Sequence, residues 1–497
     1  MRVRNAQRPV TGAEDSPAGA TGGQGRWVFA SRLVAQVAQL LIFLVAARFL
    51  APSDFGGFAL LQAVAAFLAM VASAGWREYI MASGASPAAV NHALTLSALS
   101  GLAMGAAGLA CAAATHAFAG DSSLTQLMVV FSGVVLAAPV VAGCSGVLVR
   151  GQKIASLSIA SIVGEIAGLA AAVAALVGGW GVVALGVGKL VAQVLILAIA
   201  APASGWRFQG TLASGEGRAI VARSGQILAS RMIGFINGNG ATFVVGAFLG
   251  AHSLGLYRAA ERLVSSVAEL VCEPIRTIGW ARFARFASIS DEGARRDAAR
   301  REAEHLIPLY ILFTAPVFVG LALVSEDLVR LALGPQWVGA SSVASIFALA
   351  AIAITPTLLS EPLLSAVGRI DRLPRVLAIS STASIAILAA TSQFGLHAAA
   401  LASPVSAVVS MILVARLLAR SSGVDWAASI RRATPVVAAL LALAAAATLV
   451  SGFLPSPTQT ATAAARLGAV AAAGAAAYVA ALTVLRASML RSALELI

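Results

Sequence analysis

The stretch FLAPSDFGGF at residues 49–58 returns as FLGAHSLGLY at residues 248–257, an offset of 199 positions. Two further pairs keep this offset, namely ASRL at 30–33 with ASRM at 229–232, and Arg77 with Arg276. A single short match means little in a chain so rich in Ala, Leu, Val and Gly. Three matches in one register across about fifty residues indicate an internal duplication.

Composition places the chain in a lipid bilayer. Hydrophobic residues make up 59% of the 497 positions, charged residues make up 11%, and the mean hydropathy is +0.89. A soluble protein of this length carries about 25% charged residues. The net charge of +13 does not indicate a nucleic-acid partner, because the arginines lie in short gaps between apolar runs rather than on a soluble domain.

The apolar runs predict an all-α polytopic membrane protein with about fourteen transmembrane helices, since one spanning helix needs about 20 apolar residues. In the first half of the chain the runs lie at about 27–49, 56–76, 90–117, 124–149, 155–177 and 181–201. In the second half they lie at about 226–249, 254–280, 305–325, 338–366, 374–394, 396–417, 431–452 and 463–485.

Basic residues test this span count independently. Most of the 34 Lys and Arg residues collect in alternate gaps between the apolar runs. By the positive-inside rule those gaps face the cytoplasm. Both termini fall on the same side as the basic gaps. We therefore expect a multi-pass protein of the bacterial inner membrane with cytoplasmic N and C termini.

These boundaries predict two lobes with short extensions. Residues 1–25 contain no apolar core of a signal peptide, so they are expected to form a disordered cytoplasmic tail. The basic insert at 281–304 is expected to be a cytoplasmic or interfacial helix attracted to anionic headgroups, or alternatively a solvated connector. The remaining divisions are a first lobe at 26–203, a cytoplasmic linker at 204–225, a second lobe at 226–420 and two appended helices at 421–497.

The repeat and the predicted spans together indicate the architecture of a membrane transporter. An offset of 199 residues corresponds to six predicted helices, an even number, so both copies insert in the same orientation. Parallel repeats of this kind are related by an axis along the membrane normal, as in several transporter folds. The predicted architecture is two parallel six-helix repeats followed by two C-terminal helices, which favours alternating access between the lobes.

The duplicated turns also carry a resemblance. Residues 48–60, RFLAPSDFGGFAL, and residues 248–263, FLGAHSLGLYRAAERL, resemble the first periplasmic turn of polysaccharide-biosynthesis flippases of the Wzx type. That family belongs to a superfamily with MATE antiporters and lipid II flippases. The resemblance implies V-shaped MATE-like lobes around a central cavity. It also implies transport of an undecaprenyl-diphosphate-linked oligosaccharide to the periplasmic leaflet, with polysaccharide polymerases and glycosyltransferases as possible partners.

Charged residues within the spans are the candidate site residues, because each costs about 2.5–3.5 kcal/mol at the centre of a bilayer. Four of them lie on one face of the 254–280 helix, within about 40° at 100° per residue. They are Arg258, Arg262, Glu269 and Arg276. The stripe is expected to line a wet cavity, with Arg258 and Arg262 toward substrate and Glu269 as an ion-coupling or ion-pairing group. The alternative is a ladder of ion pairs within the helix.

Two further arginines occupy equivalent positions in the two repeats. Arg32 and Arg231 lie one or two turns into the first helix of each lobe. In a pseudo-twofold structure they would face each other across the cytoplasmic mouth of the cavity. Guanidinium groups bind phosphate oxygens through a planar fork, which suits a diphosphate. The alternative is that both side chains extend to the lipid headgroups.

The third candidate pair flanks the tight turn at Gly178-Gly179-Trp180. Glu165 and Lys189 lie at about 21 and 15 Å from that turn along their helices, at 1.5 Å per residue. One interpretation is a buried ion pair. The other is that Lys189 adds to a cationic substrate cavity while Glu165 takes part in ion coupling.

Other classes of function find little support. No nucleophile and base, metal-ligand spacing or cofactor motif is apparent, and Gly186-Val-Gly-Lys189 lacks the remaining residues of a phosphate loop. A MATE-type antiporter would carry an acid in its first or seventh helix, yet residues 27–49 and 226–250 contain none. A polysaccharide polymerase would need a large periplasmic loop. A lipid II flippase remains as the principal alternative to an oligosaccharide flippase.

Overall fold

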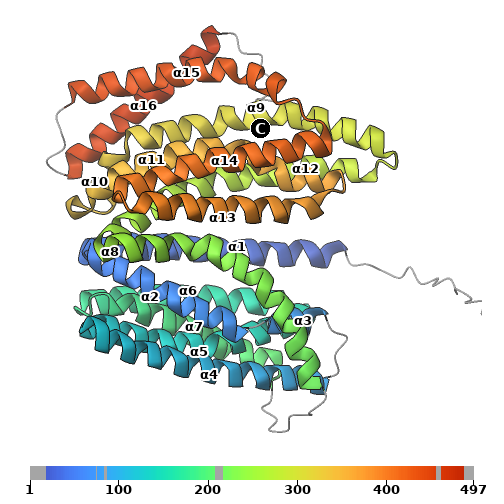
Figure 1. Cartoon of the computed structure of the whole chain (residues 1–497), viewed down its shortest axis with the longest axis vertical. Helices are drawn as coiled ribbons and strands as arrows, with labels where there is room; N and C mark the ends of the chain where they lie inside the picture. The colour runs from blue at the N-terminus through green and yellow to red at the C-terminus, as the bar shows by residue number, and fades with distance from the viewer. Residues whose placement is uncertain (1–17, 74, 83–86, 207–215, 455–459, 486–497) are drawn as a thin grey trace, which may run out of the picture.

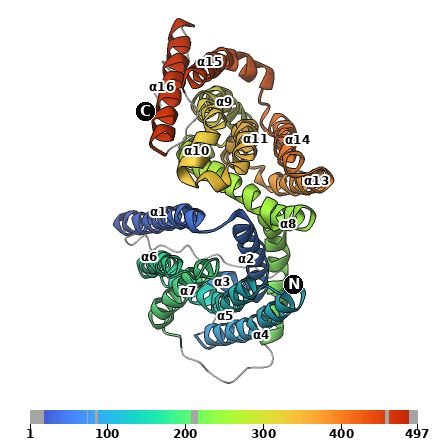
Figure 2. The same cartoon turned by 90° about the vertical axis from the view of Figure 1, so that its left-hand side faces the viewer.

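The computed structural model describes residues 18–73, 75–82, 87–206, 216–454 and 460–485. Across these residues the chain is helical and contains no strand. The helices form two bundles that are stacked along the long axis of the molecule, with α1 and α8 between them (Figure 1). When the molecule is turned by 90° about its long axis, the last two helices lie on the side of the second bundle that faces away from the first bundle (Figure 2).

The first bundle consists of seven helices. They are α1 (Ala18–Phe49), α2 (Pro52–Ser73), α3 (Trp76–Ala82), α4 (Pro87–Ala119), α5 (Ser122–Arg150), α6 (Ile154–Val177) and α7 (Val183–Ser204). Tight connections join several neighbours, because glycines supply the positive φ angles that these turns need. Gly179 and Gly181, with φ angles of 79° and 54°, make the turn between α6 and α7.

The second bundle begins with α8 (Glu216–Ala284) and is followed by the two appended helices. Its other members are α9 (Glu292–Leu323), α10 (Ser325–Ala332), α11 (Gly339–Ile354), α12 (Ser360–Ala366), α13 (Leu373–Ser392) and α14 (Leu396–Ser422). The appended helices are α15 (Trp426–Phe453) and α16 (Thr460–Val484). Short 3-10 turns connect several of them, at Arg285–Ser288, Pro335–Trp337, Thr355–Leu359 and Ile370–Arg372.

Helix α8 consists of two arms joined at Gly250, whose φ and ψ angles of 77° and 176° are not helical. The first arm, 216–249, packs on α2, where the rings of Phe67 and Phe235 lie 5.5 Å apart. The second arm, 251–284, returns along α1, since Glu269 reaches Gln36 well before the end of that helix. We call the end of the molecule at the bend the Gly250 end (left in Figure 1).

The count of candidate spans among the described residues does not reach the predicted fourteen. Among the described residues, 12 helices are long and apolar enough to cross a membrane, or up to 13 if a bent pair counts as one span. The bent pair is Gly339–Ala353 with Thr357–Ala366, which meet at 52°. The count of 12 treats Gly234–Ser288 as one span although it contains the break at Gly250. Fourteen therefore stays a prediction.

Several helix boundaries differ from the predicted ones. Helix α1 begins at Ala18, so the end of the predicted tail is helical, whereas residues 1–17 lie outside the described part. Helix α8 begins at Glu216, within the predicted linker 204–225, of which 207–215 are not described. The insert 281–304 is a continuation of α8, a 3-10 turn and the first turns of α9. Apolar runs locate spans, but helices extend beyond them wherever polar residues also favour helix.

The duplication is confirmed where the two bundles meet. A Cβ atom on Gly56 would overlap the backbone oxygen of Ala251, and a Cβ atom on Gly255 would overlap the backbone oxygen of Pro52. Residues 251 and 255 are the counterparts of 52 and 56 at the 199-residue offset. Gly56 thus contacts the counterpart of Pro52, and Pro52 contacts the counterpart of Gly56. This reciprocal pattern is that of a twofold axis.

The core of the molecule crosses this junction. One apolar cluster joins the ends of α1 and α2 to the second arm of α8 and to the segment before α11. The side chain of Trp337 is fully buried in it, and Phe55 meets the edge of the indole at a centroid distance of 5.7 Å. The two bundles are therefore held together by apolar packing at the Gly250 end.

The appended helices are fastened to the second bundle by polar contacts. The hydroxyl of Tyr478 in α16 donates to the carbonyl of Leu312 in α9 at 2.8 Å. Arg466 in α16 pairs with Asp327 in α10 at 3.6 Å. Burial raises the pKa of the Asp327 carboxyl, and the Arg466 guanidinium opposes that shift. The charge on Arg466 thus compensates for burying this carboxylate.

The glycine junction leads to a stability prediction. Gly56→Ala and Gly255→Ala should each lower the temperature at which the detergent-solubilised protein aggregates, because the added Cβ must displace a backbone carbonyl. Overpacking of this kind costs about 1–3 kcal/mol. The matched control is Gly468→Ala in α16, where an added Cβ meets nothing within 4 Å. The aggregation temperature is measured by size-exclusion chromatography after heating. Equal aggregation temperatures for Gly56→Ala and this control would contradict the close approach of the two backbones.

Candidate functional site

The principal candidate site is a cavity of about 200 Å³ next to the glycine junction. Its wall is built by α1, α2, α6 and α7 of the first bundle and by the second arm of α8. Its apolar lining includes Phe43, Phe55 and Phe58. The polar and charged residues that line it are Gln39, Gln62, Glu165, Lys189, Arg258 and Arg262. The cavity therefore draws on both repeats.

Glycines bring Glu165 and Lys189 to the same wall. A Cβ atom on Gly168 would lie 2.6 Å from the carbonyl oxygen of Gly188, so α6 and α7 pack backbone to backbone at this level. Lys189 follows Gly188 directly, and Glu165 precedes Gly168 by nearly one turn. Both side chains are half-buried. In the part of the chain that the structure describes, neither forms an ion pair.

The absence of a Glu165–Lys189 pair bears on the two sequence interpretations of these residues, which both stay predictions. The predicted buried ion pair is not formed in this conformation, and both charges face the cavity instead. A lysine that faces a cavity without a protein counter-ion can bind an anion from elsewhere. The role of Glu165 in ion coupling stays a prediction.

The charged stripe on α8 is neutralised toward its two ends. Arg258 pairs with Glu261 at 2.6 Å, and Arg276 pairs with Glu273 at 2.7 Å. Arg262, between them, lines the cavity and has no ion pair among the described residues. The ion-pair ladder that was the alternative interpretation is thus present at the ends of the stripe and missing at its middle.

Glu269 lies outside the cavity lining. Its Oε2 atom accepts a hydrogen bond from Nε2 of Gln36 in α1 at 3.2 Å. This contact joins the second arm of α8 to the first bundle on the side of the cavity away from Gly250. Glu269 therefore connects the two repeats in this conformation, and its part in ion coupling is untested.

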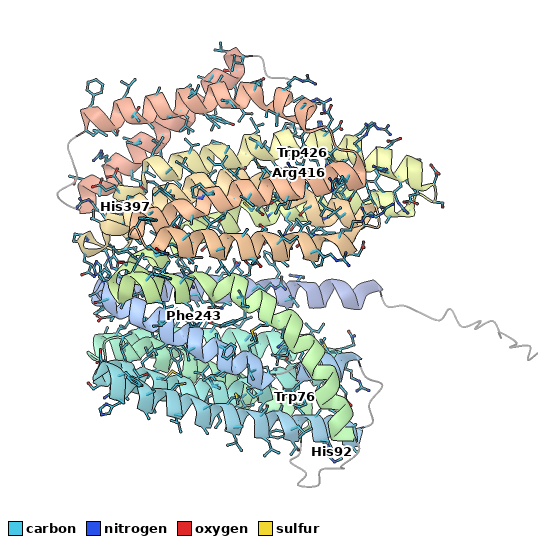
Figure 3. The ribbon with its side chains drawn as sticks, in the orientation of Figure 1. Trp76, His92, Phe243, His397, Arg416 and Trp426 are labelled. Carbon is cyan, nitrogen blue, oxygen red and sulfur yellow. The ribbon has the colours of Figure 1, made fainter. Side chains whose placement is uncertain are left out.

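The two equivalent arginines also lie outside the cavity lining. Arg231 pairs with Glu78 of α3 at 2.5 Å, and both side chains are about one-third exposed. Trp76, which begins α3, marks this region at the end opposite Gly250 (Figure 3). Arg32 is exposed and has no ion pair among the described residues. In this conformation Arg231 joins α8 to α3 of the first bundle through Glu78, and the predicted position of Arg32 opposite Arg231 stays a prediction.

Sequence reasoning missed three polar residues of this region. Gln39 and Gln62 line the cavity, but both are uncharged, so charge within the spans does not single them out. Glutamine within a span is a usable signal, since a buried amide also needs a partner. Glu78 was missed because it lies beyond the apolar run that ends near residue 76. Its contact with Arg231 joins residues 153 positions apart in the sequence.

A second cavity, almost entirely apolar, lies between the appended helices and the second bundle. Its volume is about 460 Å³, and α8, α9, α15 and α16 contribute to its wall. Tyr478, Gly474 and Gly320 are among the lining residues. Its chemistry suits a hydrocarbon chain rather than a polar molecule.

The combined chemistry of the sites is that of binding rather than catalysis. The first cavity offers two cations that form no ion pair with the described residues, two amides and several aromatic rings, which together suit an anionic, hydroxyl-bearing molecule. Within the described ranges no group of three or more His, Cys, Asp or Glu residues could hold a metal ion.

Comparison with known proteins adds a family. A family model described as a polysaccharide biosynthesis protein matches residues 45–342. The succinoglycan biosynthesis transport protein ExoT of Rhizobium meliloti is 25% identical over 341 residues, which is 65% of this chain and 65% of that protein. The match thus spans slightly less than two thirds of the relative's length.

Two solved structures share the fold at low identity. The lipid II flippase MurJ, in an inward closed conformation, matches with a TM-score of 0.68 and 12% identity over 93% of this chain and 98% of that one. A multidrug-resistance MATE family transporter, in an inward-facing conformation, matches with a TM-score of 0.57 and 13% identity over 78% of this chain and 94% of that one. These similarities confirm the MATE-like fold that the family resemblance implied.

The family match covers more than half of the chain, and the fold is that of multi-pass membrane transporters. ExoT and the two structural neighbours are named as a transport protein, a flippase and a transporter. The chain belongs to the polysaccharide biosynthesis protein family of membrane transporters.

Proposed function

We propose that the protein flips an undecaprenyl-diphosphate-linked oligosaccharide from the cytoplasmic to the periplasmic leaflet of the bacterial inner membrane, for export of exopolysaccharide, O-antigen or capsule. The observation that carries this proposal is the cavity between the repeats, which Lys189 and Arg262 line with no ion pair to any described residue. The family match and the name of the ExoT relative support the same class of cargo.

The charges of the cavity suit a diphosphate. Lys189 and Arg262 supply two positive charges, and Glu165 supplies one negative charge. The pair of Arg258 with Glu261 adds no net charge. A guanidinium can hold two phosphate oxygens at once, whereas a lysine ammonium acts as a point charge. Binding a diphosphate would therefore neutralise charges that are otherwise expensive at this depth of the membrane.

The remaining polar lining suits sugar hydroxyls. The amides of Gln39 and Gln62 each carry both donors and an acceptor, as recognition of a hydroxyl group requires. The ring of Phe43 provides an apolar surface against which a sugar ring can pack. A prenyl chain would fit the apolar cavity beside α15 and α16, where Tyr478 and Gly474 line the wall.

The small volume of the cavity supports a mechanism in which the two lobes move relative to each other. At about 200 Å³ it is smaller than the roughly 300–1,000 Å³ of pockets that enclose drug-sized ligands. A diphosphate with an attached oligosaccharide therefore needs the lobes to separate before it can enter. Alternating access of two parallel repeats provides such a separation.

The distribution of charge supports the orientation in the membrane that this proposal assumes. Basic residues gather at the end opposite Gly250, where α8 leads into α9 and where α14 leads into α15. They include Arg282, Arg285, Arg296, Arg300 and Arg416, the last of which is labelled beside Trp426 in Figure 3. By the positive-inside rule, this distribution supports an orientation in which this end faces the cytoplasm and the Gly250 end faces the periplasm.

A lipid II flippase is the second candidate, because MurJ shares the fold with a TM-score of 0.68. Both cargoes carry a prenyl diphosphate, so the cationic cavity suits either one. The family match favours the oligosaccharide carrier. A MATE-type cation antiporter is disfavoured, because α1 has no acidic residue from 27 to 49 and the cavity presents Lys189 and Arg262.

The first prediction from this function concerns loss of the protein. Deletion should stop accumulation of one surface polysaccharide and leave its lipid-linked repeat unit on the cytoplasmic side of the membrane. Mass spectrometry of extracted lipids, with sidedness probed by an impermeant sugar-oxidising reagent, measures both. Normal polymer in the deletion strain would refute the proposal. Arrested peptidoglycan synthesis with normal polymer would instead support the lipid II alternative.

The second prediction concerns the cations of the cavity. Arg262→Gln and Lys189→Gln should each reduce transport about ten- to a hundredfold, because a hydrogen bond to a charged group is worth about 1.5–3 kcal/mol. The matched control is Arg276→Gln on the same helix, where the arginine pairs with Glu273 outside the cavity. Transport is measured in proteoliposomes at equal protein amounts. Loss of the same size in the control would remove the case for a cavity-specific role.

A further inference from the structure

One segment of the second repeat has no counterpart in the first. Helices α4 and α5 are joined directly by Gly120 and Asp121, whereas α9 and α11 are separated by α10 and a 3-10 turn. We call residues 331–337, from the end of α10 through that turn, the strap. The strap breaks the twofold relation of the repeats beside the glycine junction at Gly56 and Gly255.

The strap binds the end of α1 through side-chain donors. Nε2 of Gln336 donates to the carbonyls of Ala47 and Leu50, at 2.8 and 3.1 Å. Nε1 of Trp337 donates to the same carbonyl of Ala47 at 2.8 Å. The last carbonyls of a helix have no partner within the helix, so they need donors from elsewhere. Here the second repeat caps a helix of the first.

The contact is reciprocal and apolar at its centre. Arg48 of α1 donates to the carbonyl of Leu331 at the start of the strap. Gly334 has a φ angle of 109°, which brings the strap backbone beside the Arg48 side chain. The side chains of Leu333 and Trp337 are fully buried. Separating the strap from α1 would therefore leave polar groups unpaired and expose a tryptophan.

The base of the strap is anchored in its own lobe. Ser325 in α10 is hydrogen-bonded to Ser345 in α11, with 2.6 Å between the hydroxyl oxygens. Asp327 pairs with Arg466 of α16. These contacts tie α10 to the second bundle and the appended helices. When the two lobes move apart at the Gly250 end, the strap must stay with the second lobe and release α1.

We propose that the strap is a latch that closes the Gly250 end of the transport pathway. Its hydrogen bonds to Ala47 and Leu50 form when that end is closed and break when it opens. The proposal rests on alternating access, which is part of the proposed function, but it does not depend on which cargo is carried. The glycine junction supplies close packing on the twofold axis, and the strap adds a one-sided fastening beside it.

The test uses a cysteine that reports access to the cavity. Ala59 lines the cavity, so Ala59→Cys can be labelled by a membrane-impermeant maleimide when the cavity opens to one side. The three native cysteines, Cys111, Cys144 and Cys272, are replaced by alanine. Labelling is measured from each face of the membrane in oriented vesicles, with no cargo present.

Weakening the latch should change the two labelling rates in opposite directions. In the Gln336→Leu, Trp337→Phe variant, labelling from the Gly250 face should rise about tenfold, since each lost hydrogen bond contributes about 0.5–1.5 kcal/mol. Labelling from the other face should fall, because the same equilibrium is shifted. Gln393→Leu, at an exposed position in the turn between α13 and α14, is the matched control and should change neither rate.

Three outcomes would overturn the latch. Unchanged rates from both faces would show that the strap does not hold this end closed. Parallel increases from both faces would show general loosening of the fold rather than release of a gate. Equal changes of the labelling rates in the Gln393→Leu control would show that the effect is not specific to the strap. Because cargo is absent, a failed transport assay would count against the proposed function and leave this measurement intact.

Discussion

The rest of the structure depends on a backbone contact between two pairs of residues, Pro52 and Gly56 in one repeat and Ala251 and Gly255 in the other. The contact is possible only because neither glycine carries a Cβ atom. It fixes the two bundles at one end of the molecule and places the twofold axis there. The cavity lies beside it because α1, α2 and the second arm of α8 all begin or end at this junction.

Charge is distributed unequally around this junction. The closing contacts at the Gly250 end are carbonyls that accept from amide, indole and guanidinium donors, beside buried rings such as Trp337. At the opposite end the contact between α8 and the first bundle is an ion pair of Arg231 with Glu78. In an ion pair the carboxylate can be exchanged for an anionic ligand, whereas capped carbonyls and buried rings offer an anion no such exchange. The two ends are therefore suited to different tasks.

Much of the fold could be predicted, because its main signals are local or periodic. Apolar runs located the spans, and the constant offset identified the repeat. Charge spacing on one helix face found Arg258 and Arg262, which do line the cavity. The misses involve contacts between distant segments. Glu78 meets Arg231 across 153 positions of sequence, and the caps on α1 come from Trp337 and its neighbour Gln336, which no helical period connects to it.

The unpaired charges of the cavity also bear on how the protein works. Each would cost about 2.5–3.5 kcal/mol at the centre of a bilayer, so a resting protein would be more stable if Lys189 and Glu165 paired with each other. They share one wall yet do not pair. If Lys189 and Arg262 were paired with carboxylates of the protein, those ion pairs would have to break before a diphosphate could bind. With Lys189 and Arg262 lacking ion pairs among the described residues, the free energy of the protein without cargo is raised. Binding of an anionic cargo then lowers it.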